Sequence, residues 1–217
     1  MSRPRLRILL PALTVLLILG GLVFIVSRRP RPAPPSTPFP ARGGVFFSNR
    51  LELTVPVFFQ DDPRWAQHPI GHSGSTLGPE GCAVASAAMA LAAMGIDTDP
   101  GRLNAFLSTN SGYTDRGWIH WEKAAELAPD RVWKSFEDTG NHQVLDDALL
   151  QGLTPIIRIR FPSGITHFVV IAGKEGDRYL IRDPASRHGP GPHFLDSLYP
   201  GPIEGVRLYS PVAPGRP

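Results

Sequence analysis

The chain has 217 residues, which is enough for one membrane segment and one globular domain of ordinary size. Its formal net charge is +3, but seven of its 22 Lys and Arg residues precede Gly43, whereas all 19 Asp and Glu residues follow that position. The chain after Gly43 therefore has 15 bases against 19 acids, a net charge of about −4. This balance gives no support to nucleic-acid binding, which requires a basic surface.

The first element in chain order is an uncharged run of 19 residues, 8–26, that follows a basic tail at 1–7. As a helix it would span about 28 Å, close to the hydrocarbon thickness of a bilayer. We expect an uncleaved membrane anchor, because the end of the run, Ile25 to Arg29, is a poor cleavage site for a signal peptidase. A cleaved signal peptide is the alternative.

Arginines flank this segment on both sides, so the positive-inside rule does not decide its orientation. The short tail and the signal-like start favour a domain outside the cytoplasm, and a cytoplasmic domain is the alternative. Residues 27–44 are rich in proline and end in Gly43-Gly44, which predicts a semi-extended linker with neither helix nor strand. The globular domain is then expected at 45–211, with a short tail at 212–217.

The first half of the domain has the pattern of helices. Cys82 to Met94 is rich in alanine and apolar almost all round, which predicts a buried helix. Asp99-Pro100 is an N-cap followed by proline at the first helical position. Further helices are predicted at 100–107, 118–127 and 143–150.

The second half has the pattern of strands. One further strand, broken by Pro56, is predicted ahead of the helices, at 53–59. Lys174 to Asp177 is a hairpin signal between two apolar segments. The later strands are predicted at 154–161, 167–173, 178–183 and 205–209. Because helices come first and antiparallel strands second, we expect an α+β domain with a helical half packed on an antiparallel sheet.

The single cysteine, Cys82, follows Gly81 at the start of the buried helix. A lone cysteine cannot form an internal disulfide, so it is either a small buried hydrophobe or a reactive thiol. The positive end of the helix dipole and free backbone N–H groups favour the thiolate, which is the nucleophilic form. Position alone leaves both interpretations open, and a reactive thiol also requires a base.

His167 differs from the other six histidines because it begins the apolar strand that continues from Phe168. Asp183 ends the next strand, so a hairpin would place its carboxylate near the imidazole. Such an acceptor fixes the tautomer and stabilises the imidazolium, as in a catalytic triad. Gln60 follows a predicted strand, and its carboxamide could donate to a developing oxyanion.

Four short motifs follow one another along the chain: Gln60-Asp61-Asp62 with Trp65, Gly81-Cys82-Ala83, Thr166-His167-Phe168-Val169-Val170 and Asp183-Pro184. Their order resembles family thirty-nine of the cysteine peptidases, which includes the double-glycine leader peptidases and many stand-alone bacterial relatives. The similarity extends roughly from Leu53 to Asp183 and is nearer to the stand-alone relatives, because no transporter segments follow.

This resemblance implies a papain-like cysteine peptidase fold and assigns four roles. Cys82 would be the nucleophile, His167 the general base and acid, Asp183 the orienting carboxylate and Gln60 the oxyanion donor. The segment Gly112 to His142 matches no motif of the family and is expected to be a helical insert that shapes the substrate groove.

The triad makes a demand on the predicted hairpin. His167 and Asp183 must project to one face of the sheet, which an odd loop centred on Glu175, or a bulge, would achieve. We therefore predict Gly176 at positive φ and the Asp183 carboxylate within hydrogen-bonding distance of the imidazole.

The expected partners are a peptide or protein substrate and, through residues 8–26, the membrane. Two alternatives remain open: another thiol amidase, peptidoglycan hydrolase or acyl transferase, and a non-catalytic binding module on a peptidase fold. No cofactor or metal is expected, because His68 and His72 are separated by Pro69 and Gly71, which disfavour a helix that would align them.

Overall fold

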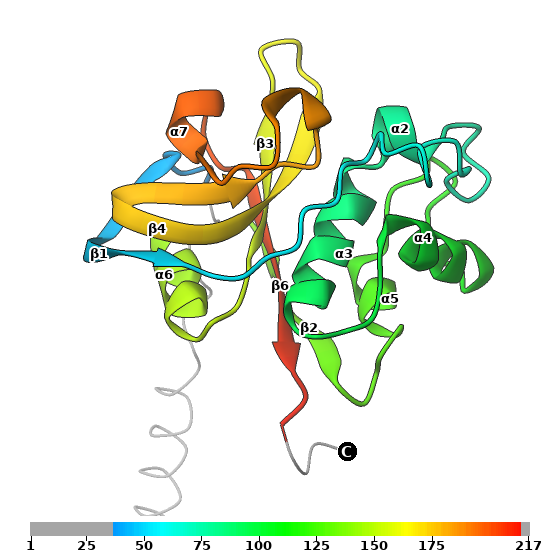
Figure 1. Ribbon diagram of the computed structural model, residues 1–217, viewed down its shortest axis with the longest axis horizontal. Helices are drawn as coiled ribbons and strands as arrows, with labels where there is room; N and C mark the ends of the chain where they lie inside the picture. Colours follow the sequence, from blue (N-terminus) through cyan, green and yellow to red (C-terminus); the bar gives the residue numbers. More distant parts are fainter. Residues whose placement is uncertain (1–36, 214–217) are drawn as a thin grey trace, which may run out of the picture. The chain divides into compact units, whose positions relative to one another are not determined.

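The computed structural model describes residues 37–213 of the chain (Figure 1). The helices are α2 (Leu77–Glu80), α3 (Cys82–Ala93), α4 (Pro100–Thr109), α5 (Trp121–Ala125), α6 (His142–Leu150), α7 (Leu195–Leu198) and the 3-10 turn η1 (Ser186–His188). The strands are β1 (Arg42–Glu52), β2 (Val132–Asp138), β3 (Ile156–Arg160), β4 (Thr166–Arg182), β5 (His193–Phe194) and β6 (Gly205–Pro211). The predicted membrane segment at 8–26 lies outside the described residues, and within 37–213 no helix combines the length and apolar character that crossing a bilayer requires.

The strands form one antiparallel sheet in the order β1-β4-β3-β6-β2, and β5 pairs with β4 beside this path. Helices α2 to α5 gather on one side of it, whereas α6 and α7 lie with the sheet half (Figure 1). The prediction of an α+β domain with a helical half against an antiparallel sheet is therefore confirmed.

Helix α3 forms the contact between the two halves. All residues from Val84 to Leu91 are buried, because the Ala-rich sequence offers no polar face to solvent. Val84 and the residues from Ala87 to Leu91 share a core with Leu103 of α4, Trp121 of α5 and Val170 of β4. A second core on the sheet side includes Leu145 of α6 and Ile157 of β3.

Strand β4 doubles back on itself, as Figure 1 shows. A straight strand of 17 residues would separate its ends by about 50 Å. Instead, Nε2 of His167, near the start of β4, lies 2.8 Å from Oδ1 of Asp183, which directly follows the end of β4. Gly176, in the bend, has the predicted positive φ, +62°. The two predicted strands 167–173 and 178–183 are thus the arms of one folded element.

The N-terminal part of the sheet differs from the prediction. The sequence predicts a linker up to Gly44 and a strand at 53–59, whereas β1 begins at Arg42 and ends at Glu52, and 53–59 is not a strand. β1 pairs with the bend of β4 through irregular registers, for example Phe47 opposite Gly176. Gly43 and Gly44 have positive φ, so residues that we assigned to the end of a semi-extended linker instead shape the start of a strand.

The segment 112–142 is not the predicted helical insert. Helix α5 covers only Trp121–Ala125, and β2 follows as an edge strand that pairs with β6, with Lys134 opposite Tyr209. Trp118 lies before this short helix and is 65% exposed, whereas Trp121 is buried. The predicted helices at 82–94, 100–107 and 143–150 correspond to α3, α4 and α6.

Candidate active site

Cys82 is the first residue of α3 and is partly exposed. Helix α2 ends just before it, and Gly81 joins the two helices. A Cβ atom at position 81 would lie 2.3 Å from the carbonyl oxygen of Leu77, so only glycine fits this turn. The turn thus presents the Cys82 thiol at the amino end of a buried helix, where backbone N–H groups lack intrahelical partners.

His167 and Asp183 form a buried pair. Nε2 of His167 donates to Oδ1 of Asp183 over 2.8 Å, and the side chains are 6% and 0% exposed. The hydrogen bond requires both side chains to face the same side of β4, as the sequence predicts. With Nε2 engaged by the carboxylate, Nδ1 is the nitrogen left to face another group.

The imidazole of His167 also interacts with Cys82. Burial disfavours its charged form, but hydrogen bonds to Asp183 and Cys82 and the negative charges of both groups outweigh burial and raise the pKa of His167 to about 9. The same geometry can stabilise a thiolate–imidazolium pair. Ser86, one turn into α3 from Cys82, donates to the carbonyl oxygen of Phe168 over 3.1 Å and so fixes α3 against β4 beside the pair.

Asp183 is held by two further donors. The backbone N–H of Ala185 donates to Oδ1 over 2.8 Å, and the Tyr199 hydroxyl donates to Oδ2 through a short hydrogen bond. Burial opposes ionisation of the carboxyl, but His167, Tyr199 and the Ala185 N–H together lower the pKa of Asp183 below its ordinary value. The carboxylate is therefore available as an acceptor for His167 at neutral pH.

Gln60 reaches both segments of this cluster. Its backbone N–H donates to the carbonyl oxygen of Pro184 over 2.9 Å, directly after Asp183. Its Nε2 donates to the carbonyl oxygen of Gly78 over 2.7 Å, in the helix that leads to Cys82. The carboxamide keeps a second N–H, and its Oε1 is buried without a hydrogen-bond partner among residues 37–213.

The cluster includes two aromatic residues that the sequence analysis missed. Phe161 stacks on the His167 ring at 5.2 Å with an angle of 24° between the planes. Tyr199 lies 5.8 Å from the same ring in addition to its bond to Asp183. Neither belongs to a local motif; the only signal for Phe161 is its place at the end of the predicted strand that precedes His167.

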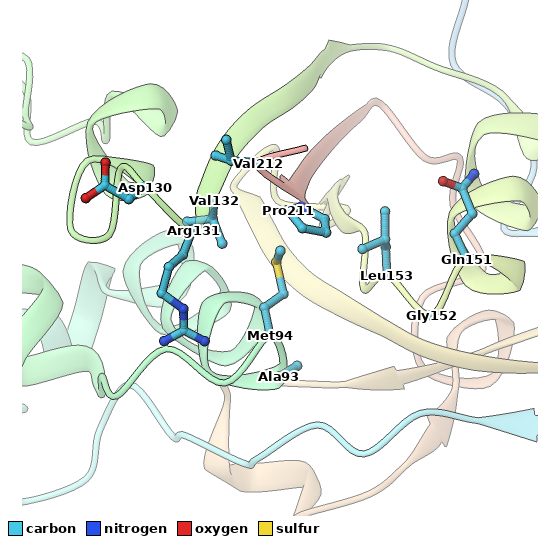
Figure 2. A pocket seen from close by; sticks show the side chains of 10 residues that line it. All are labelled: Ala93, Met94, Asp130, Arg131, Val132, Gln151, Gly152, Leu153, Pro211 and Val212. Carbon is cyan, nitrogen blue, oxygen red and sulfur yellow. The ribbon is translucent and has the colours of Figure 1, made fainter. Parts of the chain in front are cut away.

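A cavity of about 450 Å³ lies at the other end of α3 (Figure 2). Met94, Arg131 and Leu153 are among its lining residues, and none of Gln60, Cys82, His167, Asp183 and Tyr199 lines it. The candidate active site is therefore the side-chain cluster, which lies apart from this cavity. Within the described part of the chain, no three His, Cys, Asp or Glu residues are grouped as metal ligands would be.

Comparison with known proteins bears on this cluster. The model of the Peptidase_C39 like family matches residues 52–193. The chain belongs to the Peptidase_C39 like family. The matched range contains Gln60, Cys82, His167 and Asp183 and ends before Tyr199. This confirms the family resemblance of the sequence motifs, and membership suggests a cysteine peptidase.

Among solved structures, the chain is similar to a candidate C39-like peptidase from Bacillus anthracis. The two are 16% identical, with a TM-score of 0.43, over 74% of this chain and 97% of that chain. No curated protein matches the chain significantly.

Proposed function

We propose that the protein is a cysteine peptidase that hydrolyses peptide bonds through a thioester acyl-enzyme on Cys82. The observation that carries the proposal is the position of His167 between a partly exposed thiol and a buried carboxylate, with its pKa raised to about 9. This is the order of groups that nucleophilic catalysis by cysteine requires: nucleophile, base, orienting acceptor.

In the first half of the reaction, the Cys82 thiolate attacks the carbonyl carbon of the scissile bond, and a carbon–sulfur bond forms. The carbonyl oxygen becomes an oxyanion, which the Gln60 carboxamide and the backbone N–H of Cys82 would stabilise. The His167 imidazolium donates its Nδ1 proton to the leaving amine as the carbon–nitrogen bond breaks. The products of this half are a free amine and a thioester.

In the second half, neutral His167 takes a proton from water, and the resulting hydroxide attacks the thioester. The carbon–sulfur bond breaks, the acid product leaves, and the thiolate–imidazolium pair is restored. Asp183 keeps the imidazole in one orientation and tautomer throughout, because Nε2–H remains bonded to its Oδ1.

The nucleophile assignment can be tested without a known substrate. Iodoacetamide alkylation of Cys82 at graded pH, followed by mass spectrometry, measures how much thiolate is present. We expect rapid alkylation well below pH 8.5, the ordinary thiol pKa, and its loss in His167→Ala. An alkylation profile of an ordinary thiol in the wild-type protein would contradict the proposal.

Hydrolysis is tested with a peptide library, and mass spectrometry identifies cleaved bonds. Products must appear with the wild-type protein and not with Cys82→Ala. An activated Cys82 that cleaves no peptide but releases ammonia from side-chain or wall-derived amides would indicate a thiol amidase instead.

We further propose that residues 8–26 anchor the protein in the membrane with its domain outside the cytoplasm. The support comes from the sequence: an uncharged run of 19 residues and a single unpaired cysteine in the domain. A protease added to intact cells should digest the domain. Protection until the cells are lysed would contradict this orientation.

A further inference from the structure

Asp183 is fixed through both of its carboxylate oxygens. Oδ1 accepts from His167 and from the backbone N–H of Ala185, and Oδ2 accepts from the hydroxyl of Tyr199. Tyr199 directly follows α7, and it is 7% exposed. It lies 16 residues beyond Asp183 and outside the range that the family model matches.

We propose that Tyr199 is a positioning residue of the active site that acts through Asp183. Its hydroxyl holds the second carboxylate oxygen and so keeps the first one directed at His167. This inference rests on the proposed function and extends it to a residue outside the predicted triad.

The bond matters because the torsion about the terminal bond of an aspartate side chain is broad. Contacts at Oδ1 alone leave the carboxylate free to rotate about that oxygen, whereas a donor at Oδ2 fixes the carboxylate plane. The Asp183 side chain is 0% exposed, so solvent does not satisfy Oδ2 in place of Tyr199. A buried carboxylate oxygen without a donor is destabilised.

Tyr199 is suited to this role at any ordinary pH. Burial first, and then its bond to Asp183 and the charge of that carboxylate, raise the pKa of the Tyr199 hydroxyl well above its usual value. The hydroxyl therefore stays protonated and remains a donor, while Asp183 stays an acceptor.

The ring of Tyr199 is itself held in place by the segment after Asp183. His188 of η1 meets it edge-on at 5.9 Å, and Nη2 of Arg187 lies 3.5 Å from its oxygen. The ring of Phe161, which stacks on His167, lies 5.7 Å from the Tyr199 ring. The packing gives the hydroxyl one position, as a positioning residue requires.

The test compares Tyr199→Phe with a matched control, Tyr209→Phe. Tyr209 is also buried, at 2% exposure, and its hydroxyl donates to the carbonyl oxygen of Trp121 over 2.9 Å. Both variants lose one buried hydroxyl, but only the first loses a bond to Asp183. The measurement is the rate of Cys82 alkylation by iodoacetamide as a function of pH.

We expect the acid limb of the alkylation profile to move to higher pH in Tyr199→Phe. Without its donor, Asp183 takes up a proton at higher pH and then no longer stabilises the imidazolium that stabilises the thiolate. A hydrogen bond to a charged group predicts a loss of about 10-fold or more in rate on the acid limb. The profile of Tyr209→Phe should match the wild type.

Two further measurements separate positioning from general stability. On an Asp183→Asn background, Tyr199→Phe should change the rate less than about 2-fold, because residues that act through one another are not additive. Replacement of Tyr199 by 3-fluorotyrosine keeps the ring and strengthens the donor, so the acid limb should move to lower pH.

The outcomes distinguish this inference from the proposed function. An ordinary thiol profile in the wild-type protein would overturn both. An activated wild-type Cys82 together with an unchanged profile in Tyr199→Phe, or with equal losses in Tyr199→Phe and Tyr209→Phe, would overturn the role of Tyr199 alone. Equal effects of Tyr199→Phe with and without Asp183 would do the same.

Discussion

Two buried clusters of a base, a carboxylate and a tyrosine lie along the folded strand β4. One joins His167, Asp183 and Tyr199. The other joins Lys174, Asp146 and Tyr179: Nζ of Lys174 lies 2.5 Å from Oδ1 of Asp146, which also accepts from the Tyr179 hydroxyl over 3.1 Å. Because both clusters contain the same three kinds of side chain, burial of charged groups does not by itself identify an active site.

The clusters differ in what their polar groups face. The Lys174 ammonium also donates to the carbonyl oxygen of Gly43 over 2.8 Å, and Oδ2 of Asp146 accepts from the backbone N–H of Val45 over 2.7 Å. These bonds fix the start of β1 against α6 and β4, and Lys174 is fully buried. The imidazole of His167, in contrast, faces the partly exposed Cys82. This interaction with a partly exposed thiol distinguishes the candidate site from the cluster of Lys174, Asp146 and Tyr179, which we call the structural clamp.

Removal of the proposed nucleophile, Cys82, should give the largest effect. Cys82→Ala should abolish hydrolysis, a loss of at least about 10⁴-fold, because no other group can form the acyl-enzyme. The change is small and lies in an Ala-rich helix, so the free energy of unfolding should change by less than about 1 kcal/mol. Assays with any substrate found, alongside urea denaturation, check both parts. Residual turnover above background would show that the nucleophile is a different residue.

Disruption of the structural clamp should lower the stability of the protein and leave the reactivity of Cys82 unchanged. Lys174→Met leaves Asp146 buried without its cation, which should lower the free energy of unfolding by about 3–5 kcal/mol. The double variant Lys174→Met/Asp146→Leu removes both charges and should recover part of this loss. In the folded protein, the alkylation profile of Cys82 should stay as in the wild type. A changed profile would mean that the two clusters are coupled through β4.

Removal of the proposed oxyanion donor, Gln60, should give an intermediate effect. Gln60→Ala should lower kcat by about 10²–10³-fold, by analogy with other side-chain donors to an oxyanion. Alkylation by iodoacetamide forms no oxyanion and should be almost unchanged, which is the internal control. If alkylation falls as much as kcat, Gln60 supports the Cys82 turn through Gly78 and is not an oxyanion donor.

Local signals made much of the fold predictable. Asp99, the predicted N-cap, accepts from the N–H of Arg102 at the start of α4. The apolar run after Cys82 predicted the buried helix because its pattern has no polar face. The proximity of His167 and Asp183 was predictable because a short hairpin joins them.

Non-local pairing explains what the sequence analysis missed. β1 is held by residues of β4 more than 120 positions away, with register shifts and two glycines at its start, so no alternating pattern marks it. β2 pairs with β6, about 75 residues away, and its sequence is mostly polar. Tyr199 reaches Asp183 only because α7 packs beside β4, and no spacing rule anticipates that contact.

The smallest predicted effect is the pH dependence of stability, which differs between His167 of the candidate site and His142 beside the structural clamp. The pKa of His167 is raised to about 9 from 6.5, so folding favours its protonated form. That contribution to stability is complete below about pH 6.5 and is lost as pH rises through about 9. His142, whose Nδ1 lies 3.0 Å from the Tyr179 hydroxyl, has a lowered pKa, first because of burial and then because of the Lys174 charge. Its contribution has the opposite sign and is lost as pH falls.

NMR titration of the imidazole protons, with urea denaturation between about pH 5 and 10, checks both signs. Cys82→Ala sharpens the comparison, because it removes the side chain whose hydrogen bond and electrostatic interaction raise the pKa of His167. In that variant His167 should titrate at lower pH than in the wild type, and the loss of stability on the basic side should begin earlier. His142 should titrate as before, because its pKa depends on burial, Lys174 and Asp146. A wild-type His167 that titrates near 6.5, or one that Cys82→Ala leaves unchanged, would contradict a thiolate–imidazolium pair and would reduce the candidate site to a second structural clamp.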